Sequence, residues 1–342
     1  MPATEIPGRV RMRELAAQFP DQLRDGFHSG RQLGPTVSPK VRQIALVGMG
    51  GSAIAGDLLG NVTEPETDRT VAVVRSPDLP RAIDRDWLVV CASYSGGTWE
   101  TIAAFEEAGR RSASRIVVSS GGRLSELAAD EGVPCLVVPA GLPPRSAVGY
   151  MLGGLLGACD PIFPESNEAR LHAALHLLES RRRRIEGPKG APAALAHQLG
   201  SRSPYIYAET GFGGLARRWK TQVEENAKRL AHFDLLPELF HNALVPWDAI
   251  SPREAARRGV VLLEWARQDP RIGRRFRYLE RLVRARGACV TRVRLGHPDR
   301  LASLLEGVWW GDFVSLELAD MGRVDPFEVH AITRMKSALA HG

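Results

Sequence analysis

The sequence predicts an α/β fold with a doubly wound parallel sheet in each of two domains. In the first half, short runs of valine, isoleucine and leucine alternate with helical patterns. Continuous apolar runs are typical of strands that are buried on both faces of a parallel sheet, and the alternation favours right-handed strand–helix–strand units. The same alternation resumes after residue 200, and 342 residues are enough for two hydrophobic cores.

The first half contains five expected strands with a helix between or after them. The strands are expected at Gln43–Val47, Val71–Val74, Trp87–Ala92, Arg115–Val118 and Cys135–Val138. The helices are expected at Ala53–Leu59, Thr98–Gly109, Leu124–Asp130 and Ala147–Cys159. All parallel strands end at one edge of a sheet, so the loops that follow them are the expected place for a ligand.

The second half follows a helix that ends near Arg184 and a turn-rich stretch at Gly187–Pro192. Its strands are expected at Tyr205–Ala208, Val260–Leu263 and Cys289–Val293. Its helices are expected at Gly214–Leu230, Arg274–Arg286, Leu301–Leu318 and Phe327–Leu339. We therefore expect an N-terminal domain at residues 1–160, a connecting helix and linker at 161–200, and a C-terminal domain at 201–342.

Composition and charge exclude several classes of protein. The chain is 44% hydrophobic and 25% charged and has no apolar run of about 18 residues, so we expect a cytoplasmic protein without a membrane partner. Its net charge is +6, but the densest basic run, Arg181–Arg184, follows a helical pattern and is typical of a solvated helix end. We expect no nucleic-acid partner, and the positive charge suits a phosphorylated substrate. The four scattered cysteines indicate buried thiols rather than a metal site.

The first expected strand runs into a glycine-rich loop, Gly48–Ala53, before a helix. Glycines there allow a sharp turn that presents backbone N–H groups to an anion at the helix N-terminus. The same letters fit the dinucleotide pattern GxGxxA, which also needs an acidic residue after the second strand. Arg75 and Ser76 follow that strand instead, which leaves only an NADP-type variant of this reading.

The third expected strand ends in a loop that places three hydroxyl groups, on Ser93, Ser95 and Thr98, within six residues. These groups can donate to the peripheral oxygens of a phosphomonoester. Thr98 alone could be a helix N-cap, but capping does not explain all three hydroxyls. With Ser52 from the first loop they form an expected phosphate cup. Its predicted members are Gly50, Gly51, Ser52, Ser93, Ser95 and Thr98.

Several motifs, in order along nearly the whole chain, together resemble one family. They are GMGGSAIAGD (48–57), SYSGGTWET (93–101), Pro144–Ala147, Trp219–Gln222, Glu224–Lys228, Pro237–Glu238, His241–Asn242, Gly311–Asp312 and Asp325–Pro326. The chain resembles the bifunctional phosphoglucose/phosphomannose isomerase family, in the phosphoglucose isomerase superfamily. This resemblance implies two sugar isomerase (SIS) domains, each an αβα sandwich, and phosphosugar binding through the hydroxyl-rich loop.

The resemblance also implies a reaction and four catalytic residues. It implies interconversion of glucose 6-phosphate, or mannose 6-phosphate, and fructose 6-phosphate through a cis-enediol, without a cofactor or metal. By position in the motifs, Glu225 is the base, Arg145 stabilises the enediolate, and Lys336 contacts the substrate. His241 matches the family histidine that opens the sugar ring from the partner subunit, so the resemblance implies a homodimer.

Each catalytic candidate also has a structural alternative. Glu225 could be a solvated carboxylate paired with Lys228 or Arg229, at i+3 and i+4 on one helix face. Glu224 is the neighbouring carboxylate but points about 100° away around a helix. Arg145 could be a surface arginine at a helix start, Lys336 a solvated lysine, and His241 a structural histidine.

Two departures from the family pattern leave other functions open. The family loop reads SGNT where this chain has Gly97 in place of the asparagine, and the family threonine before the C-terminal lysine has no match closer than Thr333. These departures motivate the alternative of a SIS-type protein that senses a phosphosugar without converting it. They bear most directly on mannose 6-phosphate as a substrate. An NADP-dependent enzyme is the third possibility.

Overall fold

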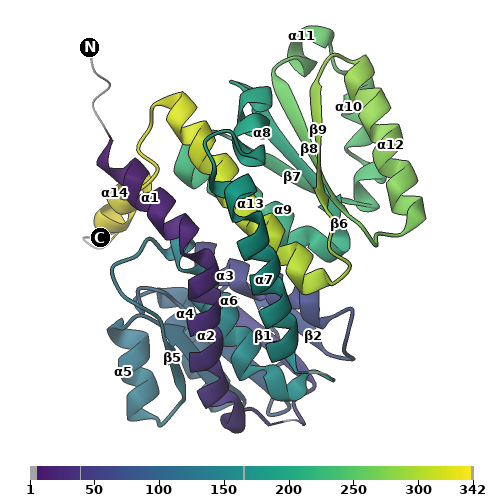
Figure 1. The fold of residues 1–342 in the computed structure, drawn as a ribbon. Helices are drawn as coiled ribbons and strands as arrows, with labels where there is room; N and C mark the ends of the chain where they lie inside the picture. Colours follow the sequence, from purple (N-terminus) through teal and green to yellow (C-terminus); the bar gives the residue numbers. More distant parts are fainter. Residues whose placement is uncertain (1–5, 39, 165, 340–342) are drawn as a thin grey trace.

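The chain forms two parallel β-sheets flanked by helices, as the sequence predicts (Figure 1). The computed structural model describes residues 6–38, 40–164 and 166–339. The first sheet has the order β2-β1-β3-β4-β5 and the second has the order β7-β6-β8-β9. The strands of the first sheet are β1 (Gln43–Gly48), β2 (Thr70–Val74), β3 (Trp87–Ala92), β4 (Ser114–Ser119) and β5 (Cys135–Val137). Those of the second are β6 (Ser203–Glu209), β7 (His232–Leu236), β8 (Arg258–Trp265) and β9 (Cys289–Leu295).

The first sheet is buried on both faces, which explains its continuous apolar strands. Along β1, Ile44 and Leu46 face the core shared with the second half of the chain, whereas Ala45 and Val47 face the outer helices. The inner helices are α1 (Pro7–Ala17), α2 (Phe19–Leu33), α3 (Gly50–Thr63) and α6 (Val148–Ala158). The outer helices are α4 (Trp99–Arg110) and α5 (Gly122–Asp130).

The second sheet repeats this plan with one strand fewer. Along β8, Val261 and Leu263 face the shared core, and Val260 and Leu262 face the outer helices. The helices on its inner side are α7 (Asn167–Glu186), α8 (Ala191–Leu199), α9 (Gly213–Ala227) and α13 (Arg300–Gly322). On its outer side are α10 (Leu244–Ala249) and α12 (Pro270–Ala285), with the short α11 (Pro252–Ala255) nearby. The last helix is α14 (His330–Leu339).

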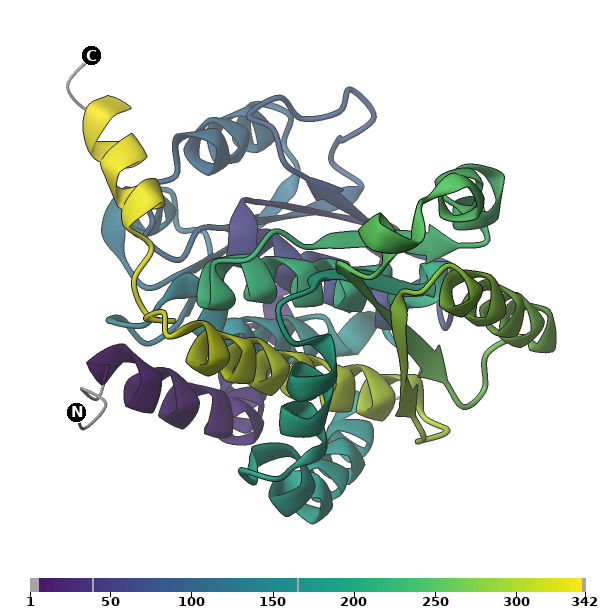
Figure 2. The same cartoon turned by 90° about the horizontal axis from the view of Figure 1, so that it is seen from above.

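Helix α13 lies between the two sheets and is buried along almost its whole length (Figure 2). It packs against α9, α7, α8 and α1, and the Trp309 indole N–H donates to the carbonyl of Ala16 at 2.7 Å. One continuous hydrophobic core therefore includes residues from both sheets. In both views α1 and α14 lie at the same side of the molecule.

Three expected boundaries were wrong in ways that matter for the site. Helix α3 begins at Gly50 rather than Ala53, so the first glycine-rich loop is largely the first turn of that helix. Helix α9 ends at Ala227, because Lys228 adopts a left-handed conformation (φ 55°). Helix α14 begins at His330, not at Phe327. The elements α1, α2, β7, α8, α10 and α11 were not predicted. Among the described residues, no helix is long and apolar enough to cross a membrane.

Candidate active site

The two phosphate-loop candidates meet where the strand order of the first sheet reverses. They follow β1 and β3, which are paired, and loops at such a switch point are where open α/β sheets bind ligands. The Ser52 hydroxyl accepts a hydrogen bond from the backbone N–H of Tyr94 at 3.3 Å, which joins the two loops directly. The structure therefore brings the predicted hydroxyl groups of both loops to one place.

The hydroxyls of the second loop are not used as a helix cap. Thr98 occupies the N-cap position of α4 but caps nothing with its side chain. Its hydroxyl instead accepts a hydrogen bond from Ser93 at 2.8 Å, which leaves the Thr98 proton free to donate to a ligand. Ser95 is exposed at the rim and accepts from the N–H of Gly97 at 3.4 Å. The chain turns at Gly96 with φ 66°, a conformation that glycine adopts without strain.

Arg145 lies directly against the first loop. It belongs to the short 3-10 helix η2 (Pro144–Ser146), and a Cβ added to Gly51 would lie 3.2 Å from backbone atoms of Arg145 and Pro144. Only a glycine fits this approach without displacing backbone. Arg145 is 2% exposed, so the alternative of a surface arginine at a helix start is wrong.

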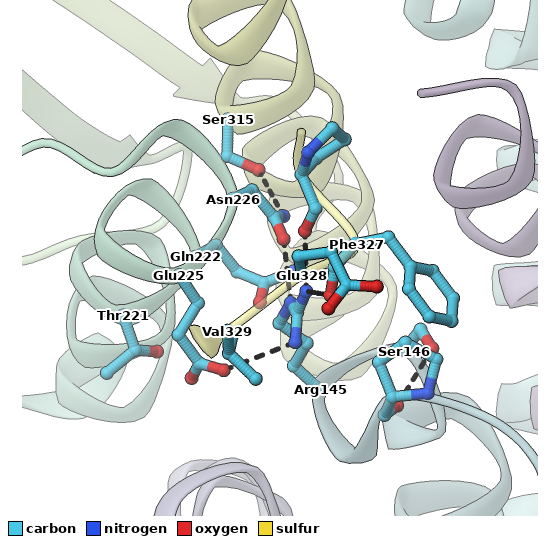
Figure 3. A network of polar contacts seen from close by, with 12 residues as sticks. Arg145, Ser146, Thr221, Gln222, Glu225, Asn226, Ser315, Phe327, Glu328 and Val329 are labelled. Carbon is cyan, nitrogen blue, oxygen red and sulfur yellow. Dashed lines mark hydrogen bonds and ion pairs between the residues drawn. The ribbon is translucent and has the colours of Figure 1, made fainter. Parts of the chain in front are cut away.

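The guanidinium of Arg145 is held from three sides (Figure 3). Its Nε donates to Oδ1 of Asn226 at 2.7 Å, and Nη2 donates to the carbonyls of Pro326 and Phe327 at 2.6 and 2.9 Å. The remaining nitrogen, Nη1, lies 3.4 Å from Oε2 of Glu225. Burial, opposed by the charge of Glu225, lowers the pKa of Arg145. An arginine remains charged even so, and Nη1 is the part of it directed at the candidate base.

Glu225 lies in the last turn of α9 with its side chain 27% exposed, on the wall of an open pocket of about 960 Å³. The pocket is lined from one side by α9 and from the other by the chain that leads into α14. Its lining residues include Glu224, Glu225, Lys228, Val324, Asp325, Glu328, Val329 and His330. A carboxylate between a buried cation and an open pocket can take and return a proton on a bound molecule.

The alternative partners of Glu225 are engaged elsewhere. The Lys228 ammonium donates to the backbone carbonyl of Glu225, not to its carboxylate, and Arg229 donates to the carbonyls of Gly200 and Leu318. The neighbouring carboxylate, Glu224, pairs with Lys220 at 2.6 Å. Of the two adjacent glutamates, Glu225 is therefore the one that contacts Arg145.

A buried polar network beneath the site fixes the orientation of α9. Arg218 bridges the carboxylate of Asp312, at 2.8 Å, and the carbonyl of Arg145, at 3.1 Å. Gln222 donates to the other oxygen of Asp312, and Asn226 donates to the hydroxyl of Ser315. Burial raises the pKa of Asp312, and Arg218 opposes that shift. Because buried polar groups are costly to leave unpaired, this network defines one position for the helix.

Two predicted residues are not joined to Glu225 within the chain. His241 ends the 3-10 helix η5 (Glu238–His241) and is exposed, and it is absent from the described residues that line the pocket of Glu225. The contribution of His241 from a partner subunit stays a prediction. Lys336 falls within α14, but its side chain lies outside the described part of the structure. Arg75, which an NADP site would need, is bound to the carboxylate of Asp57.

The sequence placed Asn226 and Lys228 in a motif, but it indicated no role for Asn226 and for Lys228 only a possible ion pair with Glu225. In the structure Asn226 orients Arg145, and Lys228 connects α9 to the chain before α14, through the carbonyls of Glu225 and Glu328. Their place beside Glu225 in the stretch 224–228 was the only signal. Arg145 also contacts the backbone carbonyls of Pro326 and Phe327. Every residue has such a carbonyl, so the residue types in the sequence could not indicate these contacts.

Comparisons with known proteins show the family of this chain. The family model described as bacterial phospho-glucose isomerase C-terminal SIS domain matches residues 189–339. The bifunctional phosphoglucose/phosphomannose isomerase of Caldicellulosiruptor bescii is 30% identical over 96% of this chain and 99% of its own length. The chain belongs to the bifunctional phosphoglucose/phosphomannose isomerase family. The resemblance inferred from the motifs is thereby confirmed.

A second relative supports the same family assignment, and a solved structure supports the fold. The bifunctional phosphoglucose/phosphomannose isomerase of Aquifex aeolicus is 32% identical over 86% of this chain and 90% of its own length. The C-terminal domain of glucosamine-fructose-6-phosphate aminotransferase from Francisella tularensis has a TM-score of 0.68 at 14% identity, covering 92% of this chain and 96% of that one. The predicted fold of two SIS-type α/β domains is confirmed. The limits of the two domains stay a prediction.

Proposed function

We propose that this member of the phosphoglucose/phosphomannose isomerase family interconverts glucose 6-phosphate and fructose 6-phosphate. The observation that carries the proposal is the contact of Glu225 with the buried Arg145, which itself packs on the glycine-rich loop through Gly51. A base, a cation and an anion-binding loop are then neighbours. The substrate names come from relatives that are similar along nearly the whole chain.

In the proposed reaction the phosphate binds the N–H groups of Gly50 and Gly51 and the hydroxyls of Ser52, Ser93, Ser95 and Thr98. Glu225 removes the proton from C2 of the open-chain aldose and returns it to C1 of the cis-enediol, while the hydroxyl proton passes from O2 to O1, which yields the ketose. The Nη1 group of Arg145 stabilises the enediolate oxygen, where a preorganised charge is most effective. Lys336 contacts the sugar.

We further propose that the enzyme acts as a cytoplasmic homodimer in which His241 of one subunit opens the sugar ring in the site of the other. Leu230, which lines the pocket beside Glu225, is 78% exposed, and Ile332 across the pocket is 41% exposed. A second subunit would cover these apolar side chains. An imidazole titrates near neutral pH, so it can accept and deliver the ring-opening proton.

The first experiment compares the wild type with Glu225→Gln in a coupled assay that measures glucose 6-phosphate formed from fructose 6-phosphate. Loss of the base should lower kcat about 10²- to 10⁴-fold, while fructose 6-phosphate still raises the melting temperature. Glu224→Gln is the matched control, since it removes the adjacent carboxylate, and it should remain active. Substantial turnover by the Glu225 variant would exclude this carboxylate as the base.

A wild-type protein that binds fructose 6-phosphate but never converts it would instead support the phosphosugar sensor. The replacement of the family asparagine by Gly97 motivates that second candidate. The same assay with mannose 6-phosphate tests whether the second aldose is accepted.

Mixing two inactive variants tests the shared site. In a symmetric dimer, a Glu225→Gln subunit and a His241→Asn subunit would restore one intact site per heterodimer. Random exchange of equal amounts would then recover about a quarter of wild-type activity. No recovery, with exchange verified by native mass spectrometry, would show that His241 does not act across the interface.

A further inference from the structure

The chain between α13 and α14 forms one wall of the pocket that contains Glu225. We call Asp325 to Val329 the 325–329 segment. It is not helical, although its sequence favoured a helix from Phe327. The Phe327 ring points away from Glu225 and lies under the guanidinium of Arg11, at 4.6 Å. Val329 lies on the Glu225 side of the segment (Figure 3) and lines the pocket.

Two cations hold three consecutive carbonyls of this segment. Arg145 donates to the carbonyls of Pro326 and Phe327, and the ammonium of Lys228 donates to that of Glu328 at 2.6 Å. Both cations also contact Glu225, Arg145 at the carboxylate and Lys228 at the backbone carbonyl, at 2.5 Å. The segment is therefore fastened to the same residue that carries the candidate base.

The backbone of Lys228 explains how its side chain reaches both carbonyls. Helix α9 ends one residue earlier, and Lys228 takes a left-handed conformation with φ 55°. The carbonyls of a last helical turn have no partner within the helix, and Lys228 satisfies that of Glu225. Burial, with Arg145 as the next cause, lowers the pKa of Lys228. Lys228 is exposed, yet its ammonium bonds two carbonyls that join the end of α9 to the 325–329 segment.

We propose that Lys228 is a positioning residue that holds the 325–329 segment so that Val329 forms the apolar wall of the sugar pocket beside Glu225. This inference rests on the proposed isomerase function of that pocket. The wall would contact the substrate equally in its ground and transition states. Loss of Lys228 should therefore raise KM more than it lowers kcat.

The test uses three variants of the full chain. Lys228→Met removes the ammonium, Lys228→Arg restores a donor that can reach two carbonyls, and Lys220→Met is a control on the same helix that breaks only the pair with Glu224. Amide hydrogen exchange of residues 327–332, measured without substrate, reports on the segment directly. We expect exchange at least tenfold faster in Lys228→Met, and near wild-type rates in the other two.

The kinetic measurement separates positioning from chemistry. In Lys228→Met we expect KM for fructose 6-phosphate to rise about tenfold with less than a threefold change in kcat, and Lys228→Arg to recover most of the loss. Unchanged exchange in Lys228→Met, or an equal effect of Lys220→Met, would overturn the proposal. If the wild type proves inactive, the isomerase function fails, while hydrogen exchange and the affinity for fructose 6-phosphate still decide the role of Lys228.

Discussion

The two sheets have the same strand order around their switch points, yet the loops at the two places carry different side chains. The loops after β1 and β3 carry glycines and hydroxyls: Ser93 donates to Thr98, and Ser52 accepts from the backbone N–H of Tyr94. At the ends of β6 and β8 lie an aromatic ring and a cation instead. Phe212 is 1% exposed there, and the guanidinium of Arg300 lies over the rings of Phe212 and Trp265, at 5.1 and 4.4 Å.

The difference lies in side chains and not in topology. In the second sheet the only hydroxyl of the short helix η4 (Thr210–Phe212), on Thr210, donates to the carbonyl of Leu236, and Arg300 donates to that of Gly211. A cation and an aromatic ring of the chain itself thus lie at the switch point of the second sheet, where the first sheet has hydroxyl groups. The strand order indicates where a ligand site can form, and the side chains of the loops determine whether a ligand can bind there.

Substituting one glycine in each switch-point loop should give the largest contrast. A Cβ at Gly96 would lie 1.8 Å from the carbonyl oxygen of Gly121, and its φ of 66° strains other residues. We expect Gly96→Ala to lower the free energy of unfolding by about 3 kcal/mol or more. A Cβ at Gly211 meets only the flexible end of Arg300, at 2.5 Å, so Gly211→Ala should cost about 1 kcal/mol. Urea denaturation measures both, and equal losses would contradict the contrast.

Removing hydroxyl groups should lower the affinity for fructose 6-phosphate in the loop after β3 but not in the loop after β6. Ser93→Ala combined with Thr98→Val deletes the Thr98 donor to the phosphate, worth about 1.5–3 kcal/mol against a charged partner, and the Ser93 hydroxyl that orients it. The affinity for fructose 6-phosphate, measured by calorimetry, should fall at least tenfold. Thr210→Val removes a hydroxyl that serves only the backbone of β7, and its affinity should equal that of the wild type. A similar loss of affinity in the double variant and in Thr210→Val would mean that these hydroxyls affect binding only by stabilising the fold.

Most strands of the two sheets were predictable because a strand that is buried on both faces has a continuous run of apolar residues. Strand β3, for example, was placed without error at Trp87–Ala92. Strand β7 was missed since it is an edge strand in which only Leu236 is fully buried. The start of α14 was wrong because Arg145 and Lys228, distant in the chain, hold the carbonyls of residues 326–328 outside a helix.

The candidate site was predictable only in its parts. The hydroxyl loop and Glu225 lie in recognisable motifs, but Glu225 and Arg145 are 80 positions apart, and their contact depends on how α9 packs. Nothing local in the sequence distinguishes Glu225 from Glu224 except their rotation about the helix. The buried support from Asp312 and Ser315 comes from yet another helix, α13.

The smallest expected effect concerns the switch point of the second sheet, between β6 and β8. Arg300→Met should lose the contacts of the guanidinium with Phe212 and Trp265 and lower the free energy of unfolding by about 1 kcal/mol. Arg267→Met is the matched control, because Arg267 and Arg300 line one open pocket of about 520 Å³ and Arg267 is exposed. Neither variant should change the affinity for fructose 6-phosphate. A clear loss of affinity in Arg300→Met would indicate that the second switch point contributes to the site.

Helix α13 has a consequence for how the molecule melts. Its buried side chains belong to the same core as those of β1 and β8, so neither sheet can lose its inner layer while the other keeps it. The two halves should therefore unfold in one cooperative step, with equal calorimetric and van't Hoff enthalpies, despite a chain length at which domains often melt separately. Cutting the chain in the linker near residue 190 would then yield two fragments that are stable only together.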